Sequence, residues 1–236
     1  MAVPVPLTNQ LIDGLLRKDR NKLIKAGETV ELQFGQVLCQ PREAFRYAFF
    51  PFTGFISLMS TLPDRQPLEL GLIGNEGMLG VTLVLGLDAA PLRAVVHGPG
   101  TALRLRVSQL RRQFRASPSL LKMLHRYQYV LNVQLCTSAA CAYFHAVDVR
   151  LATFLLMAHD RAQSDSFNLT HQYLANMLGA RRSGVTVAAG VLQRRSLIRY
   201  TRGEISILDR DGLEDASCEC YSARMQDYAQ FLTPLQ

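Results

Sequence analysis

Arginines are concentrated near the end of this chain of 236 residues, in the stretch from Leu169 to Ile205. Six arginines and one acidic residue lie there, a balance of +5, whereas the whole chain carries a net charge of only +7. Guanidinium groups donate paired hydrogen bonds to phosphates and to other planar acceptors. The concentration of charge therefore predicts an anionic partner. The charged residues are Arg181, Arg182, Arg194, Arg195, Arg199, Arg202 and Glu204.

The same stretch has the pattern of two short helices joined by a turn. Thr170 can cap a first helix over residues 171–178, Gly179 ends it, and a second helix is predicted over residues 180–195. Apolar residues of the second helix recur at helical spacing, so they face the first helix. These residues are Val185, Ala188, Ala189 and Leu192. Two short helices separated by a glycine-containing turn indicate a helix-turn-helix.

The outward face of the second helix carries side chains that suit the major groove of DNA. Arginine can bind guanine O6 and N7, hydroxyls can bond to several bases, and valine can touch a thymine methyl. Residues 196–208 then alternate like two strands joined at Gly203, which predicts a wing with Arg202 at its tip. The alternative is a solvated helical hairpin with an arginine-rich face.

Double-stranded DNA is the partner that these features predict. Four residues at the start of the second helix are expected to read bases, and Arg181, Arg194 and Arg195 are expected to contact phosphates. The expected readers are Arg182, Ser183, Thr186 and Val187. The other expected contacts are Thr170, His171, Gln172, Arg181, Arg194, Arg195 and Arg202.

The N-terminal half must position this motif, and its pattern is different. Residues from Thr8 to Lys25 read as one amphipathic helix that Thr8 caps and Gly27 ends. From Glu28 to Leu105, short apolar runs with period-two alternation are separated by glycine, proline and aspartate. Many short strands with regular turns predict a β-sandwich or jelly roll. The expected fold class is α+β.

A long helix is predicted from Ser117 onward. Its apolar positions at Leu120, Leu124, Tyr127 and Leu131 form one stripe. The stripe could pack on the β domain of its own chain or on the same helix of a second chain, and we expect a dimer seam there. The predicted domains are a β-roll over residues 1–115, a dimerisation helix over 116–145 and a winged helix-turn-helix over 146–236.

Composition limits the remaining possibilities. Hydrophobic residues make up 48% and charged residues 19% of the chain, which is typical of a globular protein and not of a disordered one. No leader or membrane-spanning segment is recognised, so a cytoplasmic location is expected. The five cysteines and five histidines show no common metal-binding spacing, and no metal or cofactor is expected. Cys218 and Cys220 could instead sense oxidation.

The order of β-roll, long helix and winged helix-turn-helix resembles the Crp/Fnr regulators of bacteria over nearly the whole chain. Arg182 falls where members of that family commonly carry the first base-reading arginine. Two neighbouring positions depart from the pattern: Ser183 stands where glutamate is frequent, and Val187 where a second arginine is frequent. The usual half-site sequence therefore does not carry over to this chain.

The resemblance also implies an effector site in the β-roll. Cyclic-nucleotide-binding members use a glutamate for the ribose and, about ten residues later, an arginine for the phosphate. The candidates here are Glu76 and Arg93, but they are 17 residues apart and Ala94 replaces the hydroxyl residue. Leu135 and Cys136 stand where cyclic-AMP binders place hydroxyls. The cysteines do not match the iron–sulfur members, and His97 is the nearest candidate for a haem ligand, although a lone histidine in a strand is more often structural.

The function expected from these features is that of a homodimeric transcription regulator. It would bind a pseudo-palindromic site, contact RNA polymerase, and respond to an unidentified small-molecule effector or to none. One alternative is a cyclic-nucleotide-responsive regulator or receptor, which would need an intact cassette. Another is a cupin-like metal enzyme, which would need converging metal ligands, whereas His97 is the only histidine between residues 28 and 105. No enzymatic activity is expected.

Overall fold

The computed structural model describes residues 8–61, 67–162 and 164–232. The outermost limits of the predicted domains, residues 1 and 236, lie outside these ranges. The prediction of a single N-terminal helix capped by Thr8 is wrong. The segment forms two helices, α1 (Gln10–Asp13) and α2 (Arg17–Ala26), and Asn9 caps α1. The break begins at Gly14, where a Cβ would lie 2.6 Å from Cε of Met123. The chain bends there because it packs closely on a later helix.

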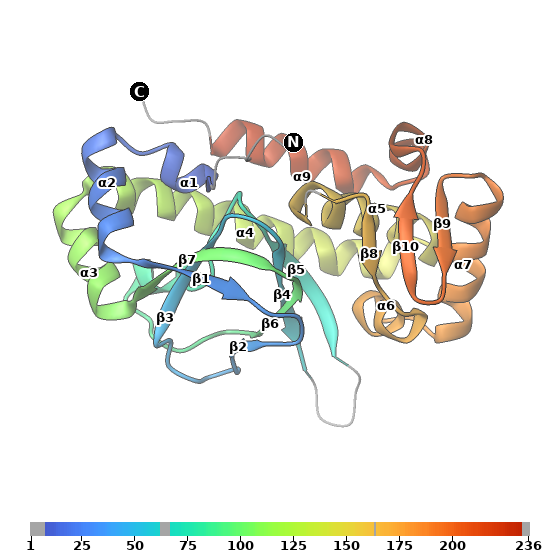
Figure 1. Ribbon diagram of the computed structural model, residues 1–236, viewed down its shortest axis with the longest axis horizontal. Coiled ribbons are helices and arrows are strands. Elements are labelled where there is room, and N and C mark those ends of the chain that lie inside the picture. Colours follow the sequence, from blue (N-terminus) through green and yellow to red (C-terminus); the bar gives the residue numbers. More distant parts are fainter. Residues whose placement is uncertain (1–7, 62–66, 163, 233–236) are drawn as a thin grey trace.

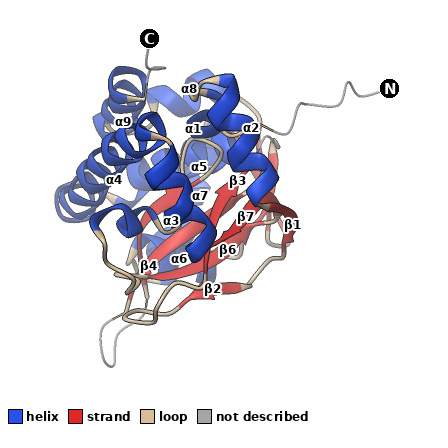
Figure 2. Ribbon diagram, turned by 90° about the vertical axis from the view of Figure 1, so that its left-hand side faces the viewer, coloured by secondary structure: helices blue, strands red, loops and turns tan. Residues whose placement is uncertain are grey.

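Within the described residues, seven strands form the N-terminal β-roll, as two sheets. One sheet has the order β1-β7-β3 and the other the order β2-β6-β4-β5, and every pairing is antiparallel. Figure 2 shows the helices gathered on one side of these strands. The predicted α+β class and jelly-roll arrangement are confirmed. The strands are β1 (Glu28–Leu32), β2 (Val37–Cys39), β3 (Tyr47–Pro51), β4 (Phe55–Ser60), β5 (Leu68–Ile73), β6 (Arg93–Gly98) and β7 (Gly100–Arg106).

One apolar run that resembles the strands in sequence is a helical turn. Residues 78–87 contain the 3-10 helix η1 (Val81–Leu85), which lies between two glycines in the left-handed region. Gly80 and Gly86 have φ values of 93° and 78°. Such values are accessible to glycine at little cost, so the chain curls here instead of extending.

Two helices follow the β-roll: α3 (Val107–Ala116), which the sequence did not indicate, and α4 (Pro118–Phe144). Ser117 caps α4 through its hydroxyl, and proline occupies the first turn, as helix starts favour. Figure 1 shows α4 and α9 running side by side along the long axis of the molecule. The predicted long helix is present.

The apolar stripe of α4 is not exposed to a second chain. Leu120, Leu124, Tyr127 and Leu131 are at most 7% exposed and belong to the core of the β-roll in their own chain. The expectation of a dimer seam at these four residues is therefore wrong for this arrangement. Their spacing reflects intramolecular packing, which was the alternative interpretation of the stripe.

The C-terminal half begins with α5, a largely buried helix. Residues of α5 share one hydrophobic core with the helix-turn-helix and with strands β4, β5 and β6. Phe55, Met59, Leu72 and Val95 are the β-roll side chains that reach into it, so this core crosses the predicted boundary near residue 145. The elements are α5 (Val147–Ala162), β8 (Ser166–Asn168), α6 (His171–Leu178), α7 (Arg182–Arg194), β9 (Ile198–Thr201), β10 (Glu204–Ile207), α8 (Arg210–Asp215) and α9 (Glu219–Phe231).

Within the described ranges, none of the helices has both the length and the apolar character that crossing a membrane requires.

Candidate nucleic-acid interface

Helices α6 and α7 form the predicted pair. The Thr170 hydroxyl accepts a hydrogen bond from the Tyr173 amide at 3.1 Å, which caps α6. Gly179 ends the helix in the left-handed conformation, with φ of 57°, and frees the chain to turn. The residues expected to face α6 are all buried: Val185, Ala188, Ala189 and Leu192.

The opposite face of α7 is exposed. Arg182, Ser183, Thr186 and Val187 all lie on it, and the apolar Val187 side chain is 66% exposed. In the major groove a valine side chain can touch a thymine methyl group. The four residues that were expected to read bases therefore share one accessible face.

His171 has a supporting position behind this face. Its Nδ1 lies 2.9 Å from the Thr186 hydroxyl, which also lies 3.0 Å from the Arg182 carbonyl. A hydroxyl has one hydrogen, so when Thr186 donates to the carbonyl, Nδ1–H of His171 donates to Thr186. The imidazole is stacked on Tyr200 with ring centroids 4.2 Å apart. Burial, together with the nearby Arg182 charge, lowers the pKa of His171.

The wing is a β9–β10 hairpin with a two-residue turn. Arg202 and Gly203 both have positive φ, 51° and 89°, as the tight turns of right-twisted hairpins require. The Leu169 amide donates to the Gly203 carbonyl at 2.7 Å, so the wing tip lies beside the start of α6. The sequence did not indicate β8, whose three residues add a third strand next to β10.

All six arginines of the stretch are exposed, and none forms an ion pair with a residue that the structure describes. Arg181 caps the start of α7 and Arg194 is its last residue. Arg199, for which no role was predicted, lies on the exposed side of β9. Buried Ile198 and exposed Arg199 alternate along β9, and this period-two pattern in the sequence could have predicted that Arg199 faces solvent. Unpaired surface charges of one sign create a positive potential that attracts an anionic polymer.

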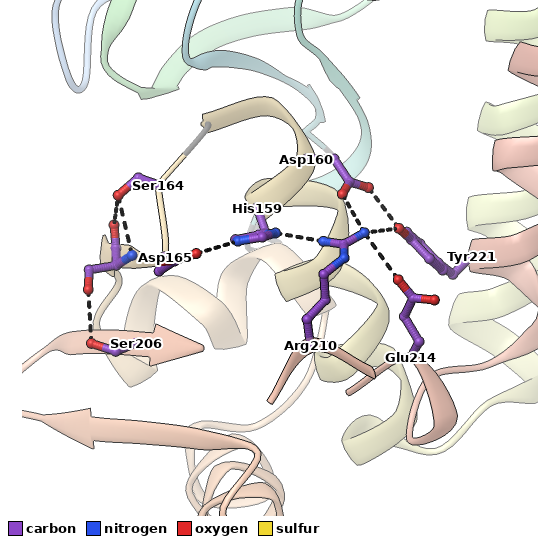
Figure 3. A network of polar contacts seen from close by, with 9 residues as sticks. His159, Asp160, Ser164, Asp165, Ser206, Arg210, Glu214 and Tyr221 are labelled. Atoms are coloured by element: carbon purple, nitrogen blue, oxygen red, sulfur yellow. Dashed lines mark hydrogen bonds and ion pairs between the residues drawn. The ribbon is translucent and has the colours of Figure 1, made fainter. Parts of the chain in front are cut away.

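A polar network joins α8 and neighbouring residues to α5, as Figure 3 shows. Arg210 at the start of α8 pairs with Asp160 at 2.8 Å and with Glu214 at 3.1 Å, and it donates to the Tyr221 hydroxyl at 2.7 Å. Arg210 also donates to Nδ1 of His159, so the proton on that ring is on Nε2, which faces Asp165 at 2.7 Å. The network fixes α8 and the segment before β8 on α5.

Comparison with known proteins agrees with this geometry. The model of the Crp-like helix-turn-helix domain matches residues 149–216. Residues 149–216 are a Crp-like helix-turn-helix domain. A Crp-like domain of this kind is the DNA-binding part of a transcription regulator, and the predicted motif is confirmed. A search of curated proteins found no match.

Solved structures extend the likeness to the β-roll and α4. FixK2 from Bradyrhizobium japonicum has a TM-score of 0.66 at 15% identity, over 81% of this chain and 98% of that one. The c-di-GMP-responsive regulator CLP of Xanthomonas campestris has a TM-score of 0.65 at 14% identity, over 80% of this chain and 98% of that one. TTHA1359, a CRP/FNR-family regulator of Thermus thermophilus, has a TM-score of 0.62 at 23% identity, over 80% of this chain and 98% of that one. The chain with its Crp-like domain therefore has the fold of the Crp/Fnr regulators.

The two residues expected to bind an effector lie apart from the cavity of the β-roll. Glu76 is buried, accepts a hydrogen bond from Nε of Arg161 at 2.9 Å, and lies 3.3 Å from the Tyr228 hydroxyl. Arg93 is half-buried, and its Nε has no hydrogen-bond partner among the described residues. Neither lines the cavity between η1 and α4, whose walls are Phe45, Leu58, Ile73, Met78, Leu79, Gly80, Val81, Thr82, Pro91, Leu92, Gln128, Leu131 and Leu135.

His97, the one candidate metal or haem ligand of the β-roll, packs between the two halves of the chain. Its ring meets Tyr173 of α6 edge-on at 4.7 Å and lies 6.0 Å from Phe34. Burial, with a smaller effect of Arg93, lowers the pKa of His97 to about 4. A neutral imidazole packed against aromatic rings has a structural role at this interface.

Proposed function

We propose that the chain acts as a homodimeric regulator of transcription, in which the exposed face of α7 reads a pseudo-palindromic DNA site. The observation that carries this proposal is the arrangement of Arg182, Ser183, Thr186 and Val187 on one accessible face, between exposed arginines at both ends of α7. Base-reading side chains at the start of a second helix, with phosphate-binding cations around them, are the usual arrangement in a helix-turn-helix.

The outer face of α4 supports the dimer. Exposed residues recur along it at alternating spacings of four and three, which is the repeat of a coiled-coil seam. Tyr143 and Tyr129 on this face are 83% and 53% exposed, and exposed tyrosines are enriched in protein–protein interfaces. The stripe consists of Pro118, Lys122, His125, Tyr129, Asn132, Cys136, Ala139 and Tyr143. Two chains paired here would present two α7 helices related by a twofold axis.

Salt dependence tests DNA binding. Each phosphate that an arginine neutralises releases about 0.9 counterion, so a dimer that uses several of the six arginines has a log–log slope of at least about −4. The probe is a duplex selected from genomic fragments that the protein retains, and sedimentation at the same salt concentrations gives the oligomeric state. A slope near zero, or no duplex binding at low salt, excludes the proposal. Binding by a monomer would exclude only the dimer.

An effector, if there is one, would occupy the cavity between η1 and α4. Its walls are apolar apart from a few groups, and two buried oxygens there, Thr82 Oγ1 and Gln128 Oε1, have no hydrogen-bond partner among the described residues. Such walls suit a small, uncharged and mainly apolar molecule better than a phosphate. The RNA polymerase contact and the cytoplasmic location follow from the regulator role and belong to the same proposal.

Cyclic nucleotides are expected to have no effect. Glu76 is already paired with Arg161, so the group that would accept the ribose hydroxyl is not free. Millimolar cyclic AMP and cyclic GMP should leave the melting temperature and the DNA affinity unchanged, since a ligand that does not bind shifts neither equilibrium. Calorimetric binding of either nucleotide at micromolar concentration would contradict this prediction.

A further inference from the structure

Four potential metal ligands meet where the end of α4 faces the start of α9. Cys141 lies in the last turn of α4, His145 caps that helix, Cys218 caps α9, and Cys220 lies in the first turn of α9. Their ligand atoms all lie within 4.8 Å of one another. Because 72 residues separate His145 from Cys218, no short spacing in the sequence indicates the group. We call these four residues the Cys3His cluster.

Two ligand distances in the Cys3His cluster match those around a single tetrahedral ion, and none of the others exceeds 4.8 Å. With Zn–S bonds near 2.3 Å and Zn–N bonds near 2.0 Å, two sulfurs are about 3.8 Å apart and a sulfur and a nitrogen about 3.5 Å. Sγ of Cys141 lies 3.6 Å from Sγ of Cys218, and Sγ of Cys220 lies 3.7 Å from Nδ1 of His145. A disulfide would join only two of the four, and an iron–sulfur cluster would distribute them over several irons.

The groups around the cluster carry positive charge or hydrogen-bond donors. Cys218 and Cys220 lie at the N-terminus of a 13-residue helix, where the helix dipole stabilises negative charge. The Cys220 amide and the Thr153 hydroxyl, 3.1 Å away, both contact the Cys218 sulfur. Arg150 and Arg224 interact electrostatically with the thiols. Three thiolates and one dication leave a charge of −1, which these guanidinium groups would balance.

The histidine of the cluster is also oriented. Nε2 of His145 lies 3.1 Å from Oε1 of Glu219, so Nδ1 is the nitrogen that faces the sulfurs. A carboxylate behind the second nitrogen of a histidine is the usual outer-shell partner of a metal ligand, because it fixes the tautomer and raises the basicity of the ring. The three cysteines are buried in a small core of their own, against Val149.

We propose that Cys141, His145, Cys218 and Cys220 bind one zinc ion in a closed structural site. Thiolate and imidazole ligands in tetrahedral array select zinc over the oxygen-preferring cations. The ion would join the end of α4 to the start of α9 and so hold the Crp-like domain in a fixed position on the long helix. The site does not depend on the proposed DNA contacts.

Metal analysis of the full chain, purified and kept under reductant, tests the site. We expect one zinc per chain, and replacement of zinc by Co²⁺ should give the intense visible absorption of tetrahedral cobalt with sulfur-to-cobalt charge transfer. Cys141→Ser and Cys218→Ser should lose both signals. Cys39→Ser and Cys136→Ser are matched controls, because these cysteines lie outside the cluster, and both variants should retain one ion.

Two further measurements apply if the cysteine variants do not fold. Glu219→Gln leaves all four ligands in place and should weaken zinc affinity about 10- to 100-fold. The wild-type chain, stripped by a chelator under reductant, should melt at a lower temperature and recover with one equivalent of Zn²⁺ but not with Mg²⁺. The proposal is overturned if the reduced wild-type chain binds neither Zn²⁺ nor Co²⁺, or if Cys141→Ser binds as much as wild type.

Discussion

At the scale of single residues, two exposed arginines of the Crp-like domain should affect DNA binding in different ways. Arg182 lies on the base-reading face of α7, whereas Arg202 lies at the wing tip. Arg182→Ala should weaken binding to a selected operator by about 1–3 kcal/mol per half-site, with a much smaller effect on random DNA. Arg202→Ala should weaken binding to both duplexes by similar factors and reduce the salt slope by about one per subunit.

Fluorescence titrations of each variant on operator and random duplexes at several salt concentrations measure these effects. Both variants must first have the melting temperature and oligomeric state of the wild-type chain, since unfolding also lowers affinity. An equal loss on all sequences for Arg182→Ala would make that residue a phosphate contact, and base reading would then fall to Ser183, Thr186 and Val187.

Glu69 on β5 should make stability depend on pH. Its Oε2 atom is buried without a hydrogen-bond partner among the described residues, and burial raises the pKa of Glu69 from 4.5 to about 8. The nearby Arg161 and Arg224 charges oppose this shift. Because the pKa is higher in the folded chain, the stabilisation is complete below about pH 4.5 and is lost as the pH rises to about 8.

Glu69→Gln removes this titration. Between pH 5 and 8 the unfolding free energy of the wild-type chain should fall relative to that of the variant, by up to about 1.4 kcal/mol per pH unit. Urea unfolding of both chains at three pH values measures the difference. Parallel pH curves would show that Glu69 is ionised in the folded chain throughout this range.

At the scale of elements, α4 has two stripes with different expected roles. Leu124 on the inner stripe is fully buried, so Leu124→Ala should lower the unfolding free energy by about 2–5 kcal/mol. Ala139 on the outer stripe is exposed, and Ala139→Glu should leave the unfolding of the single chain nearly unchanged but place two carboxylates face to face in a dimer.

Sedimentation equilibrium and urea unfolding separate the two effects. The control is Ala223→Glu, at another exposed alanine, on α9, which should change neither association nor stability. Dimers that withstand Ala139→Glu would place the seam on another surface.

The elements also show which features the sequence could predict. The helix-turn-helix and wing were predictable because local signals define them: the Thr170 cap, Gly179 and the Arg202–Gly203 turn. The long helix was predictable from its periodicity, but the partner of its apolar stripe was not, because a helix has the same pattern whichever surface covers it. The η1 turn depends on two left-handed glycines within an apolar run that also suits a strand.

The Glu76–Arg161 pair and the Cys3His cluster were still harder to predict from the sequence. Burial of Glu76 against Arg161 and the meeting of Cys141 with Cys218 join residues 85 and 77 positions apart. Contacts of this kind arise from the way that α5 and α9 pack on the rest of the chain. Spacing rules for metal or effector motifs detect only ligands that are close in sequence.

At the scale of the whole molecule, the shared core predicts that the two halves unfold together. Side chains of β4, β5 and β6 complete the core of the Crp-like domain, and the buried Glu76–Arg161 pair crosses the same boundary. The chain contains no tryptophan, so Tyr47→Trp on β3 and Tyr200→Trp on β9 can report on the two halves separately. Their urea midpoints should coincide. Two separated midpoints would show that the halves are independent.

The core that crosses residue 145 also has a consequence for how such a chain can evolve. A recombination event that joined this β-roll to the DNA-binding half of another regulator would leave Phe55, Leu72 and Val95 facing side chains that were not selected with them. The same event would separate Glu76 from Arg161 and leave a buried charge unpaired, which costs about 3–5 kcal/mol. New operator specificity in this lineage is therefore expected to arise by point substitution on the exposed face of α7 and not by exchange of whole domains.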